Sequence, residues 1–204
     1  MVFLTFICSA TPIFSQSTRV YEYWLDRFLL PRLKQKFNNH KVIDEIYVHL
    51  KSKIASVMKI KKILSEDKQA EFSEPKKYFN KELISHKTNL GKKKARTLEK
   101  LLNNLENIYG VDRNILLAIW ANESFFGRVM PKLDALQVLS LLSFSSKNRL
   151  FYLSELTYLI DFAIENKNDV RELKVSKAGA LGQPQFLPST FFKFAVDYDN
   201  DGTK

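Results

Sequence analysis

The sequence is poor in cysteine and in histidine. Its 204 residues contain one cysteine, Cys8, and three histidines. A single thiol excludes an internal disulfide framework and any metal site built from several cysteines. The histidines stand far apart in the sequence, at positions 40, 49 and 86, and suggest no histidine-based zinc cluster.

Glycine and proline are also scarce, with six of each. Every glycine lies at or after Gly91, so the first ninety residues contain none. A turn-rich all-β protein is hard to build from such a composition. Hydrophobic residues make up 45% and charged residues 26% of the chain, as in a folded soluble protein. The composition therefore predicts a mainly α fold.

Long hydrophobic runs are absent, and no stretch approaches the roughly 18 apolar residues of a membrane helix. The run Met1–Ala10 is uncharged and mostly apolar, and small polar residues follow it up to Ser17. This arrangement fits the apolar core and cleavage region of a secretory signal. We expect residues 1–17 to be a signal segment, with the buried start of an N-terminal element as the alternative.

Positive charge is concentrated in one half of the chain. Residues 1–110 carry 21 basic and 11 acidic side chains, a net charge of +10, whereas residues 111–204 carry 11 of each. A basic half indicates an anionic partner such as nucleic acid, lipid headgroups or an acidic polymer, or else a plain solvated surface. No interleaved aromatic and basic motif supports nucleic acid, so we expect none to bind.

Apolar residues at helical spacing predict several helices. We expect Pro31 to break the first of them, Gly110 to end another, and Asp112, Asp134 and Ser189 to cap the helices that follow. The helix after Asp134 is apolar on most sides, which is typical of a central helix. A polar, extended connection is expected over residues 66–80. The predicted helical stretches are 20–35, 41–64, 92–108, 112–127, 135–144, 149–165 and 189–195.

A carboxylate stands on the apolar stripe of the 112–127 helix. Leu116, Ile119, Trp120 and Glu123 follow the i, i+3, i+4, i+7 spacing of one helix face. A carboxyl group in that place should be partly desolvated, and desolvation raises a carboxyl pKa toward the range of a general acid. The alternative is a glutamate at the edge of the stripe, paired in a salt bridge with Arg128 or Lys132.

Three segments resemble one enzyme family. The segment AIWANESFFGR, which contains Glu123, resembles the catalytic segment of lytic murein transglycosylases of the membrane-bound B type, members of the lysozyme-like superfamily. The run SKAGALGQPQFLPST, starting at Ser176, and the run AVDYDNDG, starting at Ala195, are similar to later motifs of the same family. Weaker matches extend the resemblance over roughly Tyr23 to Gly202. Lys177 departs from it, since the family usually has an aromatic residue there.

The resemblance implies a lysozyme-like helical fold and cleavage of peptidoglycan between N-acetylmuramic acid and N-acetylglucosamine. The family forms a 1,6-anhydromuramic end without adding water, and it needs no cofactor for this chemistry. Glu123 would be the catalytic acid. The residues expected to meet the sugar are Ser176, Gln185, Phe186, Gly179 and Tyr109, with Gly182 allowing a close approach of the loop. Phe186 and Tyr109 would stack on sugar faces, unless they belong to the core.

The acidic run near the end of the chain has the pattern of an EF-hand-like calcium loop. Asp197, Asp199 and Asp201 occupy its first three ligand positions, and Thr203 would offer a backbone carbonyl. The acid that normally closes such a loop would lie beyond Lys204, so the site is incomplete, and a plain polar tail is the alternative. The family continues past this segment with groove-closing helices, so the resemblance describes a C-terminally truncated chain.

The sequence thus predicts three parts: the signal segment, a basic helical part over residues 20–110 and a catalytic lysozyme-like core over residues 111–204. We expect a monomer in the periplasm or cell envelope of a Gram-negative bacterium, acting on glycan strands and associating with a membrane. Two alternatives stay open. One is a goose-type-like lysozyme that hydrolyses the same bond, and the other is a non-catalytic peptidoglycan-binding fragment.

Overall fold

The structure is a computed structural model that describes residues 13–65 and 80–202. Helices dominate it, which confirms the predicted fold class, and a small antiparallel pair is formed by β1 (Leu133–Asp134) and β2 (Lys174–Val175). None of the described helices is long and apolar enough to cross a membrane. The helices are α1 (Ile13–Trp24), α2 (Leu30–Lys36), α3 (His40–Ser52), α4 (Val57–Ser65), α7 (Lys81–Thr97), α8 (Glu99–Tyr109), α9 (Arg113–Ser124), α10 (Ala135–Ser145), α11 (Arg149–Glu165) and α12 (Pro188–Phe194).

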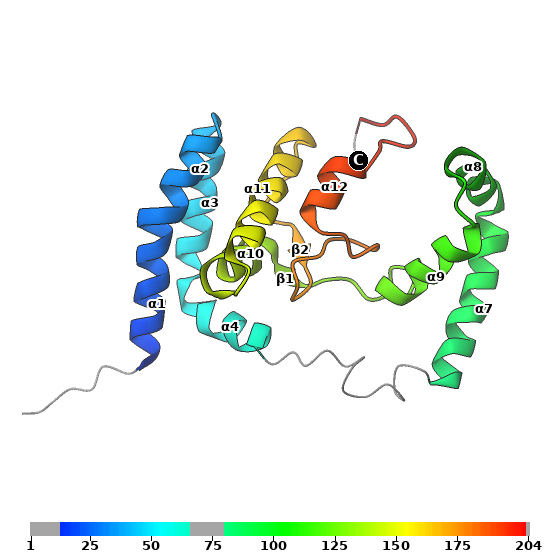
Figure 1. The fold of residues 1–204 in the computed structure, drawn as a ribbon, viewed down its shortest axis with the longest axis horizontal. Coiled ribbons are helices and arrows are strands. Elements are labelled where there is room, and N and C mark those ends of the chain that lie inside the picture. Colours follow the sequence, from blue (N-terminus) through cyan, green and yellow to red (C-terminus); the bar gives the residue numbers. More distant parts are fainter. Residues whose placement is uncertain (1–12, 66–79, 203–204) are drawn as a thin grey trace, which may run out of the picture.

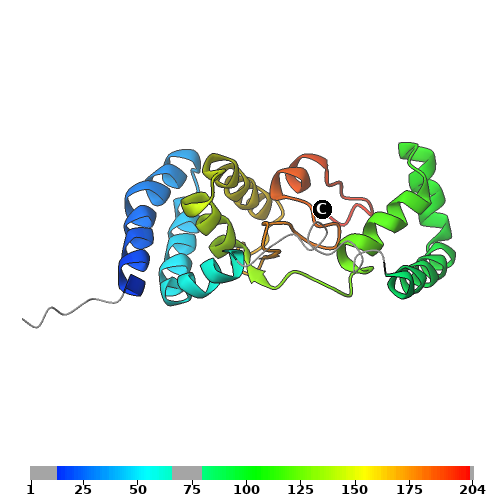
Figure 2. The same ribbon diagram turned by 60° about the horizontal axis from the view of Figure 1, so that its bottom comes forward.

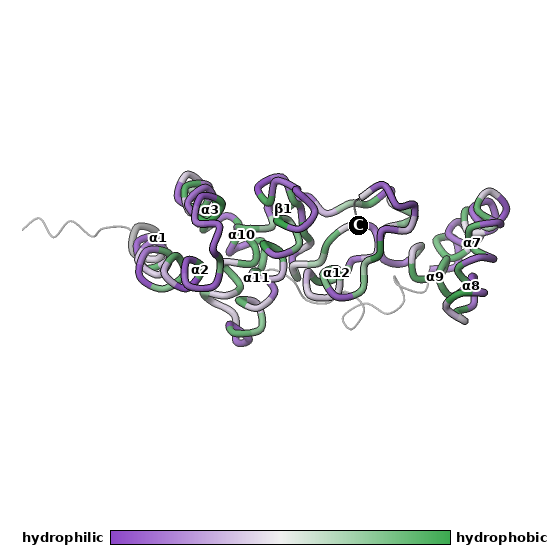
Figure 3. The backbone as a smooth tube through the Cα atoms, turned by 90° about the horizontal axis from the view of Figure 1, so that it is seen from above, coloured by the Kyte–Doolittle hydropathy of each residue, from purple (hydrophilic) through white to green (hydrophobic). Residues whose placement is uncertain are grey.

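The main hydrophobic core surrounds α10. Every residue from Ala135 to Leu141 is buried, which confirms the prediction of a central helix. Helix α10 packs mainly on α11 and also contacts α3 and α4, while α12 packs on α11. Hydrophobic stretches of the chain lie along α10 and α11 in Figure 3. This core joins residues from α1–α4 with residues that follow them by more than seventy positions, such as Ile43 and Leu136.

A second, smaller core lies in the group α7–α9, at the opposite end of the elongated molecule from α1 (Figures 1 and 2). Its buried residues are Leu102, Leu117, Ala121 and Phe126. The group lies between α4 and α10 in the sequence but outside the main core in space. The chain returns from it through β1, where Leu133 pairs with Val175 of β2.

The N-terminal helix does not break at Pro31, so that prediction is wrong. A π-helical turn, Leu25–Leu29, connects α1 directly to α2, and Pro31 lies in the first turn of α2. The Leu30 N–H donates to the Leu25 carbonyl, five residues back instead of four. This wider turn accommodates the proline, which has no N–H to donate and would otherwise clash with the preceding turn.

Three of the predicted helix ends are confirmed. Gly110 ends α8 in the left-handed conformation, at φ +66°. The Asp112 carboxylate accepts a hydrogen bond from the Asn114 N–H at 2.6 Å, and the Asp134 carboxylate accepts one from the Gln137 N–H at 3.0 Å. Both aspartates therefore cap the N-termini of the helices that follow them.

Two other boundaries differ from the sequence prediction. Helix α7 begins at Lys81, well before the predicted start at residue 92, because Asn80 caps it by accepting from two backbone N–H groups. None of its residues is buried, so the periodicity gave no signal. Ser189 is not a cap, since α12 already starts at Pro188. Residues 66–79 of the expected connection and most of the expected signal segment lie outside the described residues.

Candidate active site

The buried face of α9 is not the face that the sequence predicts. Leu117, Ala121 and Ser124 are the buried residues of α9, and they pack toward α7 and α8. Ile119 is 45% exposed, and the Glu123 side chain is exposed. The prediction of a partly desolvated Glu123 is therefore wrong for the described chain. The buried stripe is shifted by one residue from the predicted one. Aromatic and aliphatic side chains occur on both faces of this helix, so their spacing alone does not determine which face is buried.

The Glu123 carboxylate forms no hydrogen bond or ion pair with any residue that the structure describes. The alternative pairing with Arg128 is not formed, because the Arg128 guanidinium lies over the Phe125 ring at 5.7 Å from its centroid. A carboxylate that binds none of the described residues keeps its hydrogen-bonding capacity for a ligand, as far as those residues are concerned. Glu123 thus lies exposed at the surface of α9.

A tight turn follows Glu123 directly. Phe125, Phe126 and Gly127 all have positive φ, at +52°, +58° and +81°. The Ser124 hydroxyl oxygen accepts a hydrogen bond from the Gly127 N–H at 3.1 Å, and Phe126 is buried in the small core. Left-handed conformations are costly for phenylalanine, so two in sequence indicate a turn that is imposed by its surroundings. The turn fixes the C-terminal end of α9, where Glu123 lies.

The loop that follows β2 is closed by Ser176. Its hydroxyl oxygen accepts from the Ala180 N–H at 3.1 Å, and its carbonyl accepts from the Gly179 N–H at 3.0 Å. Gly179 is buried with φ +85°, and a Cβ there would lie 2.6 Å from the Leu139 Cδ2 atom. The loop backbone therefore passes directly over the central helix α10. Only glycine fits at that position.

Gln185 belongs to the next turn of the same loop. Its side-chain Nε2 donates to the Gly182 carbonyl at 2.9 Å, and its own φ is +53°. The amide oxygen of Gln185 accepts no hydrogen bond from the described residues. Phe186 is 42% exposed and Tyr109 is 57% exposed, so neither belongs to the core. Both rings present a surface that another molecule can cover.

A residue that the sequence reasoning passed over connects this loop to α9. The Trp120 indole Nε1 donates a hydrogen bond to the side-chain oxygen of Gln183 at 2.7 Å. Trp120 precedes Glu123 by three residues, and Gln183 precedes Gln185 by two. The structure thus brings the Glu123 helix and the Gln185 loop together. No sequence signal marked Gln183, whose only local feature is its place between Gly182 and Pro184.

The three acidic residues near the end of the described chain are close together in space. Carboxylate oxygens of Asp197, Asp199 and Asp201 lie within 4.8 Å of one another. The Asp197 carboxylate also accepts from the N–H groups of Asp201 and Gly202, at 3.1 and 2.8 Å. These bonds form a tight turn with its carboxylates on one side, an oxygen-only donor set that suits a hard cation. Thr203 lies outside the described residues.

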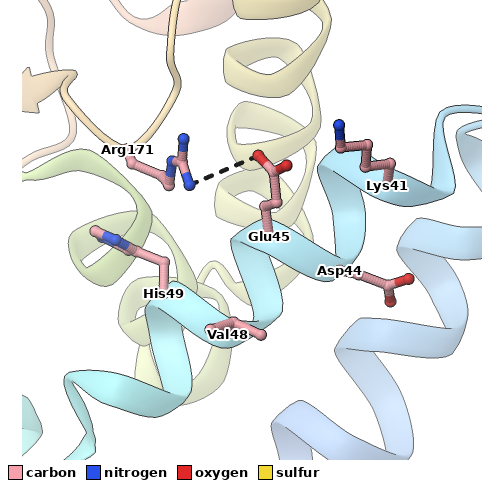
Figure 4. Close-up of a pocket in the computed structure, with 6 residues that line it drawn as sticks. All are labelled: Lys41, Asp44, Glu45, Val48, His49 and Arg171. Carbon is pink, nitrogen blue, oxygen red and sulfur yellow. Dashed lines mark ion pairs between the residues drawn. The ribbon is translucent and has the colours of Figure 1, made fainter.

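A surface hollow of about 600 Å³ lies elsewhere. It opens on α3, which Figures 1 and 2 place on the other side of α10 and α11 from α9. In the view of Figure 4, Arg171 points toward Glu45, which it meets at 3.6 Å. Arg171 also binds Asp169 and lowers the pKa of that carboxyl to about 2. None of the predicted site residues lines this hollow. The lining residues are Lys41, Asp44, Glu45, Val48, His49 and Arg171.

Comparison with known proteins gives consistent matches. The membrane-bound lytic murein transglycosylase B of Escherichia coli K12 is 40% identical over 105 residues, which cover 51% of this chain and 29% of that protein. Among solved structures, SltB3 of Pseudomonas aeruginosa in complex with NAG-NAM-pentapeptide superposes with a TM-score of 0.68 at 22% identity, covering 93% of this chain and 47% of that one.

A third match is the Escherichia coli lytic transglycosylase Slt35 in complex with calcium. It has a TM-score of 0.62 at 24% identity and covers 91% of this chain and 56% of the Slt35 chain. The present chain thus spans under a third of the curated relative and about half of these two structural relatives. The sequence matches the family described as Transglycosylase SLT domain over residues 21–204, nearly its whole length. The chain therefore belongs to the transglycosylase SLT domain family.

Proposed function

We propose that this chain is a lytic transglycosylase that cleaves the bond between N-acetylmuramic acid and N-acetylglucosamine in peptidoglycan. The observation that carries the proposal is the Glu123 carboxylate, exposed and without a partner among the described residues. Its helix is bonded through Trp120 to the Gln185 loop. The family membership and the related murein transglycosylase B of Escherichia coli support the same reaction.

The chemistry needs a single carboxyl group. Glu123 in its protonated form donates its proton to the glycosidic oxygen, and the bond from that oxygen to C1 of the muramic acid breaks. The resulting carboxylate accepts the proton of the C6 hydroxyl while O6 bonds to C1, which gives the 1,6-anhydro end. No water enters, so the second carboxylate of hydrolytic glycosidases is not required. A sugar strand lying over Glu123 would remove water from it and favour the proton-donating form.

The loop residues would bind the sugar. The amide oxygen of Gln185 accepts no hydrogen bond from the described residues. This oxygen and the hydroxyl hydrogen of Ser176 would suit the acetamido and hydroxyl groups of the strand. Gly179 lets the loop backbone lie against Leu139 of α10, and the strand would pass over the other side of that backbone. Phe186 and Tyr109 would each cover a sugar face. Apart from Tyr109, these residues lie in 111–204, the proposed catalytic core, and residues 20–110 would form the basic helical part.

The acidic turn would hold calcium as a structural ion. Asp197, Asp199 and Asp201 supply closely spaced carboxylate oxygens, which is the ligand type that calcium prefers. Slt35, which shares the fold, is described in complex with calcium. The ion would neutralise three mutually repelling carboxylates and hold the turn after α12. It would take no part in bond cleavage, and the reaction would need no cofactor.

A peptidoglycan substrate supports a location in the periplasm or cell envelope of a Gram-negative bacterium, where the protein would act as a monomer on glycan strands. The SltB3 complex with NAG-NAM-pentapeptide supports a substrate of this class. The basic charge of residues 1–110 would favour stem-peptide carboxylates of murein or an anionic membrane surface. We expect no nucleic acid to bind.

Mass spectrometry of digested sacculi tests the proposal. Wild-type protein should release anhydro-muropeptides, each lighter by one water than the product of a hydrolase. Glu123→Gln should keep its circular dichroism spectrum and release none, because a carboxamide cannot donate the proton. Reducing muramic ends would instead identify a goose-type-like lysozyme. Binding to sacculi without release of products would identify a peptidoglycan-binding protein, and cleavage by Glu123→Gln would exclude Glu123 as the acid.

A further inference from the structure

We propose that Gln183 is a positioning residue for the reaction, and that it acts by holding the Glu123 helix against the Gln185 loop through Trp120. The inference rests on the proposed function and deepens it. Its basis is the hydrogen bond of 2.7 Å from the Trp120 indole to the Gln183 oxygen, which joins residues 63 positions apart. Within the described residues, no other hydrogen bond connects α9 with the loop of residues 176–187.

The Trp120 end of this bond is held on two further sides. The Lys94 ammonium of α7 lies 4.9 Å from the centroid of the indole ring. The Phe126 ring meets the indole edge-to-face, with centroids 5.3 Å apart. A cation over the ring and an aromatic edge both stabilise one orientation of an indole. The N–H of Trp120 therefore has a fixed direction, toward the loop.

The Gln183 end is held by its backbone and by Gly127. Gly182 before it has φ +63°, and Pro184 after it restricts Gln183 to extended backbone. The Gln183 amide lies against the Cα atom of Gly127, where an added Cβ would be 2.6 Å from the amide oxygen. The absence of a side chain at Gly127 thus makes room for the amide. The amide is bound between the turn after α9 and the Trp120 indole.

The Trp120–Gln183 bond couples the position of Glu123 to the position of Gln185. Trp120 and Glu123 are separated by three residues and lie on neighbouring positions of one helix face, so a rotation of α9 moves both. Gln185 is two residues beyond Gln183, on the same turn. Loss of the bond would leave the distance between acid and sugar-binding amide less well defined. Small misplacements of that kind mainly slow the chemical step.

The kinetic test uses two matched variants. Gln183→Met keeps the length of the side chain but removes the amide oxygen, whereas Gln183→Glu keeps an oxygen acceptor for the indole. On soluble glycan strands, we expect kcat to fall about ten-fold in Gln183→Met, with KM within about two-fold of wild type, as loss of one hydrogen bond predicts. Gln183→Glu should restore most of kcat. Wild-type kcat in Gln183→Met, or a change in KM alone, would overturn the proposal.

A measurement without substrate separates this inference from the proposed function. The chain has two tryptophans, so Trp24→Phe assigns the indole N–H signal of Trp120 by NMR. We expect the Trp120 indole N–H to exchange faster with solvent in Gln183→Met than in wild type or Gln183→Glu. We also expect the side-chain amide signals of Gln185 to shift only in Gln183→Met. Inactive wild-type protein would refute the proposed function. The expected exchange rates and Gln185 shifts would still support the positioning role of the Trp120–Gln183 bond. Equal exchange in all three proteins would overturn it.

Discussion

The side chain of Glu155 caps a helix that begins 33 residues later in the sequence. Its carboxylate accepts a hydrogen bond from the Ser189 backbone N–H at 2.9 Å, although Glu155 is only 2% exposed. Ser189 lies in the first turn of α12, and Leu187 at the N-cap position has no side-chain acceptor. The buried carboxylate of α11 therefore replaces the local cap and also meets the positive end of the α12 dipole.

Replacing Glu155 tests this contact. Glu155→Leu should lower the free energy of unfolding by about 2 kcal/mol, because it leaves the partly buried Ser189 N–H without this partner. Glu155→Gln keeps an oxygen acceptor and should lose less. Urea denaturation monitored by circular dichroism measures both. Equal losses in the two variants would show that the packing of the side chain matters and the hydrogen bond does not.

A second buried carboxylate makes stability depend on pH. Burial raises the pKa of Asp134, but hydrogen bonds from the Gln137 N–H, Lys53 and His49 outweigh this effect and lower it. The His49 and Lys53 nitrogens lie 2.7 and 3.0 Å from the same carboxylate oxygen. A lowered carboxyl pKa stabilises the fold above the unfolded value, about 3.9, and this contribution disappears as the pH falls through the folded value.

Asp134→Asn isolates this charge, because asparagine still caps α10 well. The variant should be less stable than wild type by about 1 to 3 kcal/mol near pH 6. The difference should shrink as the pH is lowered below about 4. Urea titrations at several pH values measure it. A difference that stays constant down to pH 3 would mean that the charge of Asp134 does not contribute. Asp44→Asn, at an exposed site on α3, serves as a control.

Two glycines distinguish backbone strain from crowding. Gly110 and Gly179 both have positive φ, but a Cβ at Gly110 meets nothing within 4 Å, whereas one at Gly179 meets the buried Leu139 at 2.6 Å. Gly110→Ala should cost about 1 kcal/mol from strain alone. Gly179→Ala should cost a further 1 to 3 kcal/mol from overpacking. Thermal melts of the two variants check this order, and equal losses would contradict it.

Calcium should stabilise the acidic turn measurably but weakly. Calcium prefers six to eight oxygen ligands, and the described turn offers three carboxylates. Because stabilisation by a ligand follows its concentration relative to Kd, we expect a rise in Tm only at millimolar calcium. Asp199→Asn should abolish the rise. Differential scanning calorimetry with calcium and with chelator measures it. A large shift at micromolar calcium would require ligands beyond these three residues.

Sequence reasoning worked best where the signal is local. The caps Asp112 and Asp134 bind backbone groups two or three residues away, and Gly110 ends its helix through its own φ. The all-round apolar character of α10 correctly indicated its central place. Each of these features depends on a short stretch of chain, so the sequence of that stretch is enough to predict it. The roles of Glu123, Ser176 and Gln185 stay predictions that the experiments above address.

Contacts between distant segments gave no such signal. The Glu155 cap and the Trp120–Gln183 bond each join residues more than thirty positions apart. In both contacts, the sequence around one residue does not indicate which residue it binds. The exposed position of Glu123 was missed because α9 has apolar side chains on more than one face. The register of its buried stripe is decided by packing on α7 and α8. Periodicity within the helix leaves that choice open.

The main core also has a consequence for the order of folding during synthesis. Ile43 and Ile46 of α3 are fully buried in that core, which also contains residues of α10 and α11, but the ribosome produces α7–α9 between these segments. The faces of α3 and α4 that pack on α10 therefore stay uncovered until more than seventy further residues have emerged. During that interval α7–α9 can assemble on its own small core, so the segment that carries Glu123 is free to take shape before the larger core closes.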